Sequence, residues 1–198
     1  MSRLPEIRIR LPYSLIIMVG KLAGTEIDFE KFENNFKSFS KFFEKYRDKI
    51  LTKISEKGGF DWKEKDIFVY VIPEQIKKFP SMSHPLLLKL REDYYFNLYL
   101  LTHELCHRYI GENEQLVDIS FRKWKKINKL IPEAIVEFLT VDIIAELFGE
   151  EKTEELHRKE KEIVKTRDME KSYKLANKFR EKFNPKLPSP ERFLVLLE

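Results

Sequence analysis

Two stretches of the chain have the hydrophobic pattern of β-strands. Residues 7–11 alternate apolar and basic side chains, which predicts a half-buried strand. Residues 67–72, with the sequence IFVYVI, are rich in β-branched and aromatic side chains, and Pro73 follows them directly. This second segment is the strongest strand prediction in the chain.

Residues 25–57 show a helical pattern, predicted as one long helix or two in succession. Apolar side chains recur there at spacings of three and four residues, and Gly58–Gly59 ends the run as a helix stop should. We interpret the stripe as a core-facing surface; it consists of Phe29, Phe32, Phe36, Phe39, Phe43, Tyr46, Ile50 and Ile54.

The second half of the chain is predicted to be almost entirely helical. A helix is expected over 92–110, capped by Gly111, and others over 115–130, from Pro132 to about residue 148, and within the charged stretch 150–183. Residues 80–85 are expected to form a loop, and the apolar run 193–197 is expected to dock on the body. Two strands among many helices predict a mostly helical α+β fold with a small mixed sheet.

The composition fits one domain spanning residues 1–198. The chain is 42% hydrophobic, and 37 basic residues nearly balance 33 acidic ones, which argues against a nucleic-acid partner. The single cysteine, Cys106, excludes an intramolecular disulfide and suits a reducing compartment. Residues 11–20 are apolar, but the run is too short to span a bilayer. Pro12 interrupts the run, which argues against a signal peptide. We therefore expect a cytoplasmic protein without a membrane span; its oligomeric state stays open.

The segment His103-Glu104-Leu105-Cys106-His107 carries the clearest chemical signal. Histidines four residues apart on a helix project from the same face, so both imidazoles can reach one metal ion. Glu104 flanks that face and can approach an attacking water without being a ligand. This H-E-x-x-H arrangement predicts a Zn²⁺ site with Glu104 as general base. Cys106 points away from the metal face, and we expect it to pack as a small hydrophobic residue.

Glu133 and Glu137 lie four residues apart on the next predicted helix and could complete the site. A catalytic zinc needs a third protein ligand, and carboxylates on a buried face need partners. The alternative is that both are ordinary solvated side chains, a common arrangement on helices. Given the motif at 103–107, the ligand interpretation is favoured.

These two segments together resemble the gluzincin metallopeptidases, the thermolysin-like clan. The resemblance covers roughly residues 66–148. It implies a zincin-like fold with the sheet packed on the motif helix, His103, His107 and Glu133 as zinc ligands, and Glu137 as the acceptor that orients His103. Pro132 stands where the family often has Asn. The strand at 67–72 would form one wall of the cleft and offer an open edge to a peptide substrate.

The implied activity is peptide-bond hydrolysis, with Glu104 taking a proton from the attacking water and passing it to the leaving amine. The stabiliser of the oxyanion is not evident; His157, Arg158 and Tyr173 lie in the expected part of the chain without a recognisable context. The substrate, and endo- or exopeptidase action, stay undetermined.

Two other functions remain open from the sequence. One is a zinc-binding regulatory or interaction protein on a metallopeptidase scaffold, with little turnover. The other is a nucleic-acid-associated helical protein in which the motif is accidental, for which the basic run at 122–126 with Trp124 is the relevant feature. That run is interpreted instead as the solvated face of a connecting helix.

Overall fold

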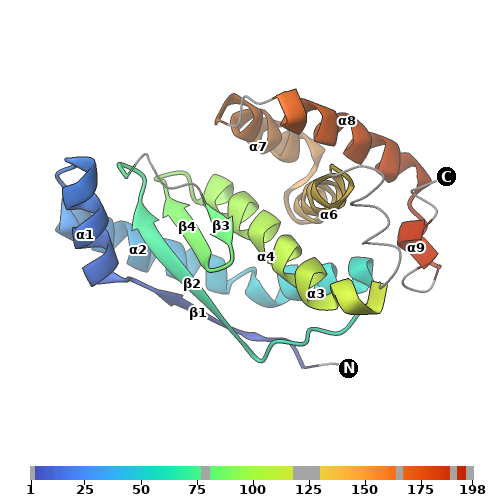
Figure 1. The fold of residues 1–198 in the computed structure, drawn as a ribbon, viewed down its shortest axis with the longest axis horizontal. Coiled ribbons are helices and arrows are strands. Elements are labelled where there is room, and N and C mark those ends of the chain that lie inside the picture. The colour runs from blue at the N-terminus through green and yellow to red at the C-terminus, as the bar shows by residue number, and fades with distance from the viewer. Residues whose placement is uncertain (1–2, 77–80, 118–129, 164–166, 188–190, 195–198) are drawn as a thin grey trace.

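The computed structural model describes residues 3–76, 81–117, 130–163, 167–187 and 191–194 (Figure 1). Its strands are β1 (Glu6–Arg10), β2 (Asp66–Pro73), β3 (Met82–Ser83) and β4 (Leu86–Leu90). Its helices are α1 (Tyr13–Ala23), α2 (Phe29–Glu44), α3 (Arg47–Gly58), α4 (Tyr94–Val117), α6 (Ile131–Phe148), α7 (Glu150–Ile163), α8 (Arg167–Lys182) and α9 (Glu191–Leu194). The described chain is therefore mostly helical with one small sheet, which confirms the predicted α+β class.

The strands form a mixed sheet in the order β1-β2-β4-β3. β1 and β4 both run parallel to β2, and only β3 is antiparallel to its neighbour β4. On β2 the side chains of Ile67, Val69 and Val71 are fully buried, whereas Phe68 and Tyr70 between them are half-buried. This alternation places one face of the sheet in the core.

The strand at 67–72 forms as predicted, but the prediction that it offers an open edge is wrong. β2 lies inside the sheet, between β1 and β4, while the two-residue β3 is the edge strand beside α4. The sequence pattern missed both β3 and β4. Leu86–Leu90 is a short apolar run, which periodicity alone cannot assign to strand or helix.

The aromatic stripe of residues 29–54 forms two helices that pack inward. The carboxylate of Asp28 caps α2 by accepting a hydrogen bond from the Lys31 amide. A turn at Lys45–Tyr46 separates α2 from α3. Gly59 ends α3 in the left-handed conformation, as the sequence predicted. The most buried members of the stripe are Phe32, Phe39, Phe43, Ile50 and Ile54.

The motif helix α4 is longer than predicted. Gly111 was expected to end it, but α4 continues through this position to Val117. An interior glycine costs about 1 kcal/mol relative to alanine. Tyr109, Ile110 and Asn113 are all buried around it, so packing outweighs that cost.

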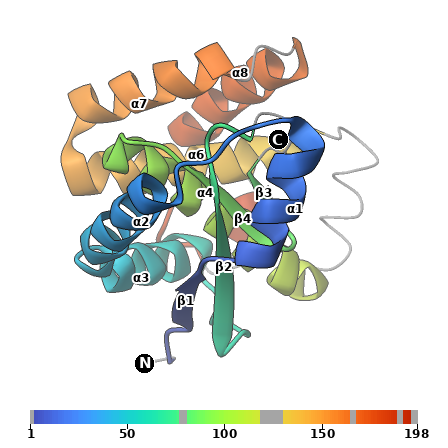
Figure 2. The same ribbon diagram turned by 90° about the vertical axis from the view of Figure 1, so that its left-hand side faces the viewer.

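Three helices build the layer beyond α4. In Figure 1, α6 is seen end-on between α4 and the pair α7–α8, and it packs against all three. Figure 2 shows α7 and α8 lying side by side across the top of the molecule. α7 and α8 account for the described part of the charged stretch predicted to be helical over 150–183, except Phe183. The buried ring of Phe193 in α9 confirms that this part of the tail docks on the body.

Two other findings concern sequence predictions. In the described part of the chain, no helix combines the length and apolarity needed to cross a membrane. The apolar run at 11–20 is folded into α1, with Ile16 and Val19 buried. Most of the helix predicted over 115–130, including the basic run at 122–126, lies outside the described residues.

A matched pair of glycine substitutions tests these helix assignments. At Gly58, an added Cβ would lie 2.7 Å from Cζ of Tyr109, whose hydroxyl is bonded to Phe60 and whose ring packs on Trp62. Gly58→Ala is therefore expected to lower the free energy of unfolding by about 1–3 kcal/mol. Gly111→Ala meets only an ordinary contact at 3.7 Å and is expected to raise it by up to about 1 kcal/mol.

Chemical denaturation of both variants measures these changes. A loss of stability in Gly111→Ala comparable to that in Gly58→Ala would contradict the continuous α4 helix.

Candidate metal centre

α4 presents the motif histidines on one face, turned toward α6. His103 is 8% exposed and its ring centroid lies 4.8 Å from that of His107. Behind them, Leu101, Leu105 and Cys106 are fully buried and anchor the helix in the core. The spacing of four residues on a well-packed helix is what brings the two imidazoles together.

α6 brings Glu133 to the two histidines, as predicted. One Glu133 oxygen lies 3.3 Å from His103 Nε2, and the other lies 3.2 Å from His107 Nε2. The two Nε2 atoms are 3.1 Å apart. A tetrahedral ion with bonds of about 2.0–2.1 Å requires ligand atoms about 3.3 Å apart. The three side chains therefore already stand at nearly the separation that a bound ion would impose.

Glu137 lies one turn further along α6 and is fully buried. Its Oε2 is 3.4 Å from His103 Nδ1, and among the described residues neither atom has a closer hydrogen-bond partner. An Nδ1–H directed at this carboxylate leaves the lone pair of Nε2 free for a metal. This position agrees with the orienting role expected for Glu137, and it excludes the alternative that the residue is solvated.

The charges at this site are strongly coupled. Burial by itself lowers the pKa of His103, but hydrogen bonds to Glu133 and Glu137 raise it well above the ordinary value. Burial likewise raises the pKa of Glu133, and the two histidines more than reverse this, so that the pKa lies well below its usual range. The carboxylate of Glu133 is thus ionised at neutral pH, as a metal ligand must be.

Glu104 adjoins the histidines but forms no part of the three-residue cluster. Burial raises the pKa of its carboxyl above the ordinary value, while His103 and His107 partly lower it again. A carboxylate whose pKa is raised toward neutrality is a better proton acceptor in general base catalysis. The environment of Glu104 therefore fits the role predicted for it.

A buried polar network extends behind Glu137. Tyr99 Oη is 3.0 Å and His157 Nδ1 is 2.6 Å from Glu137 Oε1. Glu160 Oε2 lies 3.1 Å from Tyr99 Oη and 3.3 Å from Tyr173 Oη. Burial and the charge of Glu137 raise the pKa of Glu160, so this second carboxyl is held protonated at neutral pH.

Sequence reasoning missed most of this network. Tyr99 stands four residues before His103, and His157 and Glu160 are three apart on α7, so each spacing places side chains on a shared helix face. Nothing in the sequence links these helices. His157 and Tyr173 were considered as oxyanion stabilisers, but their recorded partners are Glu137 and Glu160, and Arg158 is exposed.

Cys106 plays no part in the polar site. It is fully buried, and burial raises the pKa of its thiol to about 12. A thiol that stays protonated is neither a nucleophile nor a ligand at neutral pH. The prediction that it packs as a small hydrophobic residue is therefore confirmed.

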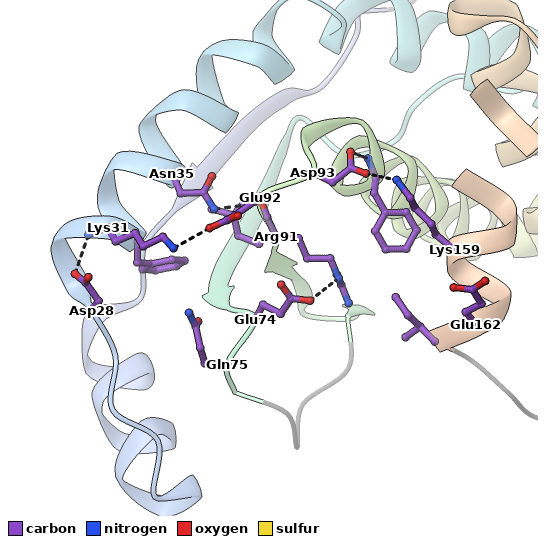
Figure 3. A pocket seen from close by; sticks show the side chains of 14 residues that line it. Asp28, Lys31, Asn35, Glu74, Gln75, Arg91, Glu92, Asp93, Lys159 and Glu162 are labelled. Carbon is purple, nitrogen blue, oxygen red and sulfur yellow. Dashed lines mark hydrogen bonds and ion pairs between the residues drawn. The ribbon is translucent and has the colours of Figure 1, made fainter. Parts of the chain in front are cut away.

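A larger cavity than any at the metal centre lies elsewhere in the described chain, apart from the histidines and Glu133. It has a volume of about 500 Å³ and lies at the carboxyl ends of β2 and β4, bordered by α2 and α7. Figure 3 shows three ion pairs among its side chains: Lys31 with Glu92, Arg91 with Glu74, and Lys159 with Asp93. Of the residues that line it, none is a histidine or cysteine.

A smaller cavity of about 260 Å³ opens beside the buried network, between α6, α7 and α8. Glu137, His157 and Tyr173 contribute to its wall, whereas His107, Glu104 and Glu133 do not. This cavity therefore borders the side of Glu137 that faces away from the motif histidines.

Within the described residues, two groups of side chains are close enough to hold a metal ion. The first is His103, His107 and Glu133; the second, fully buried, is His103, Glu137 and Glu160. Only the first presents the Nε2 atoms of both motif histidines. No protein-family model, curated protein or solved structure matches the chain.

Proposed function

We propose that this protein is a zinc-dependent metallopeptidase with a zincin-like architecture. The observation that carries the proposal is the triangle of His103 Nε2, His107 Nε2 and the Glu133 carboxylate, with sides of 3.1–3.3 Å. Its dimensions suit the ligand edges of a tetrahedral metal.

The donor set favours zinc among the common metals. Two imidazoles and one carboxylate, with a fourth position left to water, is an arrangement of catalytic zinc sites. Calcium and magnesium prefer oxygen ligands, which the two histidines do not provide. Zinc, when bound, supplies a Lewis acid that polarises a carbonyl and lowers the pKa of water toward about 7.

Glu104 supplies the proton chemistry of the proposed reaction. Its carboxylate accepts a proton as water attacks the peptide carbonyl carbon, and it then delivers that proton to the nitrogen of the leaving amine as the C–N bond breaks. Glu137 holds His103 in the tautomer whose Nε2 faces the ligand triangle. Glu133, as an anionic ligand, would offset part of the positive charge of the ion.

The peptide substrate would lie along the edge of the sheet beside α4. β3, and not β2, is the edge strand there. Arg108, next to His107 in sequence, donates a hydrogen bond to the carbonyl of Ser83 and fastens this strand to the motif helix. Strand addition at such an edge is a common way to bind an extended peptide.

A zinc-binding regulatory or interaction protein with little turnover is the second candidate. The observation that favours it is the placement of His157 and Tyr173, which bond to Glu137 and Glu160. Both residues were candidates for stabilising the oxyanion. Because they contact Glu137 and Glu160, neither is assigned to that role. Both candidate functions share the metal centre, and they differ in whether the protein hydrolyses peptides.

Metal content and hydrolysis test the proposal together. The purified protein is expected to contain one zinc per chain, and a peptide library should be cleaved by the zinc-loaded protein and left intact after chelation. Restoring zinc should restore cleavage. Protein without stoichiometric zinc would refute the metal centre, whereas zinc binding without cleavage would select the regulatory candidate.

A further inference from the structure

The far side of Glu137 is held by side chains from two other helices. Tyr99 on α4 and His157 on α7 both contact the same oxygen, Oε1, at 3.0 Å and 2.6 Å. The other oxygen, Oε2, is left facing His103 Nδ1 at 3.4 Å. The two oxygens of Glu137 are thus divided between this network and the histidine.

A second layer secures Tyr99. Its hydroxyl lies 3.1 Å from Glu160 Oε2, and the same carboxyl oxygen lies 3.3 Å from the Tyr173 hydroxyl. The rings of His157 and Tyr173 pack edge to face, with centroids 4.8 Å apart. Glu160 is 3% exposed, so it meets these partners with almost no contact with solvent.

Core packing does not account for this arrangement. Two carboxyl groups within one buried cluster are costly, and an apolar pair would fill the space at lower cost. α7 is otherwise a charged surface helix, whose other buried side chains are Thr153 and Leu156. Thr153 donates a hydrogen bond to the Gly149 carbonyl at the start of its own helix, whereas His157 and Glu160 reach the network around Glu137.

We infer that Tyr99, His157 and Glu160 are positioning residues of the metal centre, and that α7 is therefore part of that centre. The inference rests on the proposed zinc site. By holding Oε1, Tyr99 and His157 fix the rotation of the Glu137 carboxylate and present Oε2 to His103 Nδ1. This sets the tautomer of His103 and the direction of its Nε2. Glu160 acts one step further out, through the Tyr99 hydroxyl.

The same residues could have formed a second metal site, because His103, Glu137 and Glu160 lie close enough together. The hydrogen bonds argue against it. Glu137 Oε1 and Glu160 Oε2 both lie within hydrogen-bond distance of the Tyr99 hydroxyl, and an Nδ1–H on His103 has no lone pair to offer. One zinc per chain is therefore expected, and two per chain would overturn the inference.

Two tyrosine variants of the full chain provide the test. Tyr99→Phe removes only a hydroxyl and should weaken zinc binding about 10- to 100-fold, the usual effect of losing an outer partner of a ligand. Tyr109→Phe is the matched control: it is a fully buried tyrosine on the same helix, but its hydroxyl bonds to Phe60. It should lose stability without losing zinc affinity. Chelator competition measures both affinities.

Two further measurements separate positioning from a general structural effect. The visible spectrum of the Co²⁺-substituted protein should change in Tyr99→Phe and stay unchanged in Tyr109→Phe. If Tyr99 acts through Glu137, the double variant Tyr99→Phe/Glu137→Gln should bind zinc no more weakly than Glu137→Gln alone. Additive losses, or equal affinities for the two tyrosine variants, would overturn the inference while leaving the zinc site intact. A wild-type protein that binds no zinc would refute the site itself.

Discussion

Glu104→Gln is expected to lower kcat for peptide hydrolysis by roughly 100- to 10,000-fold, the usual contribution of a general base. The amide has nearly the shape of the carboxylate but cannot accept the proton of the attacking water. Zinc content should be unchanged, because Glu104 lies outside the group of His103, His107 and Glu133. Steady-state kinetics on a cleaved library peptide, with metal analysis of the same sample, measures both quantities.

The control for this variant is Glu112→Gln, which makes the same change on the same helix two turns beyond Glu104. It should retain wild-type turnover. If Glu104→Gln cleaves the peptide as fast as the control does, the role of Glu104 as general base is wrong. If the wild type binds zinc but cleaves nothing, the regulatory function becomes the better explanation.

Glu133→Ala is expected to weaken zinc binding by more than roughly 100-fold. That is the largest loss usually caused by removing a residue that hydrogen-bonds to a metal ligand. The substitution removes one of three protein ligands and leaves the buried His103 without its closest counter-charge. Glu137→Gln, which removes only the orienting carboxylate, should fall within about 10- to 100-fold. Chelator competition against both variants gives the order of the two losses.

Glu146→Gln is the control on the same helix, since Glu146 pairs with Lys57 on α3 and not with the histidines. Its zinc affinity should equal that of the wild type. A larger loss in Glu137→Gln than in Glu133→Ala would show that the ion is held by His103, Glu137 and Glu160. The assignment of Glu133 as third ligand would then be wrong.

The parts of the metal centre that could be predicted are those encoded by local spacing. His103 and His107 share a helix face because four residues make about one turn, and Glu133 and Glu137 share one for the same reason. That these two faces meet was inferred from the need of buried carboxylates for partners and from the family resemblance, and the structure brings Glu133 to both histidines. The aromatic stripe of 29–54 was also recognisable from its helical period, and the strand at 67–72 from its β-branched and aromatic composition.

Local patterns could not predict which strand forms the edge of the sheet or where α4 ends. Whether β2 is an inner strand depends on β4 and β3, which follow it in the chain and pair with it or with each other. Gly111 looks locally like a helix stop, yet Tyr109 and Asn113 on either side are buried and α4 continues. In α4 this packing outweighs the local cost of about 1 kcal/mol for an interior glycine.

The sequence by itself determined which residues can bind a metal and which faces of their helices they occupy, because helix geometry depends only on neighbours three and four positions away. Only the tertiary structure decided how Glu137 is held. Tyr99 on α4 contacts Glu137 across 38 residues of sequence, and His157 contacts it from α7. Glu160 on α7 contacts Tyr99 across 61 residues. Buried carboxylates are stable only where such donors converge, and convergence is a property of packed helices that no single segment contains.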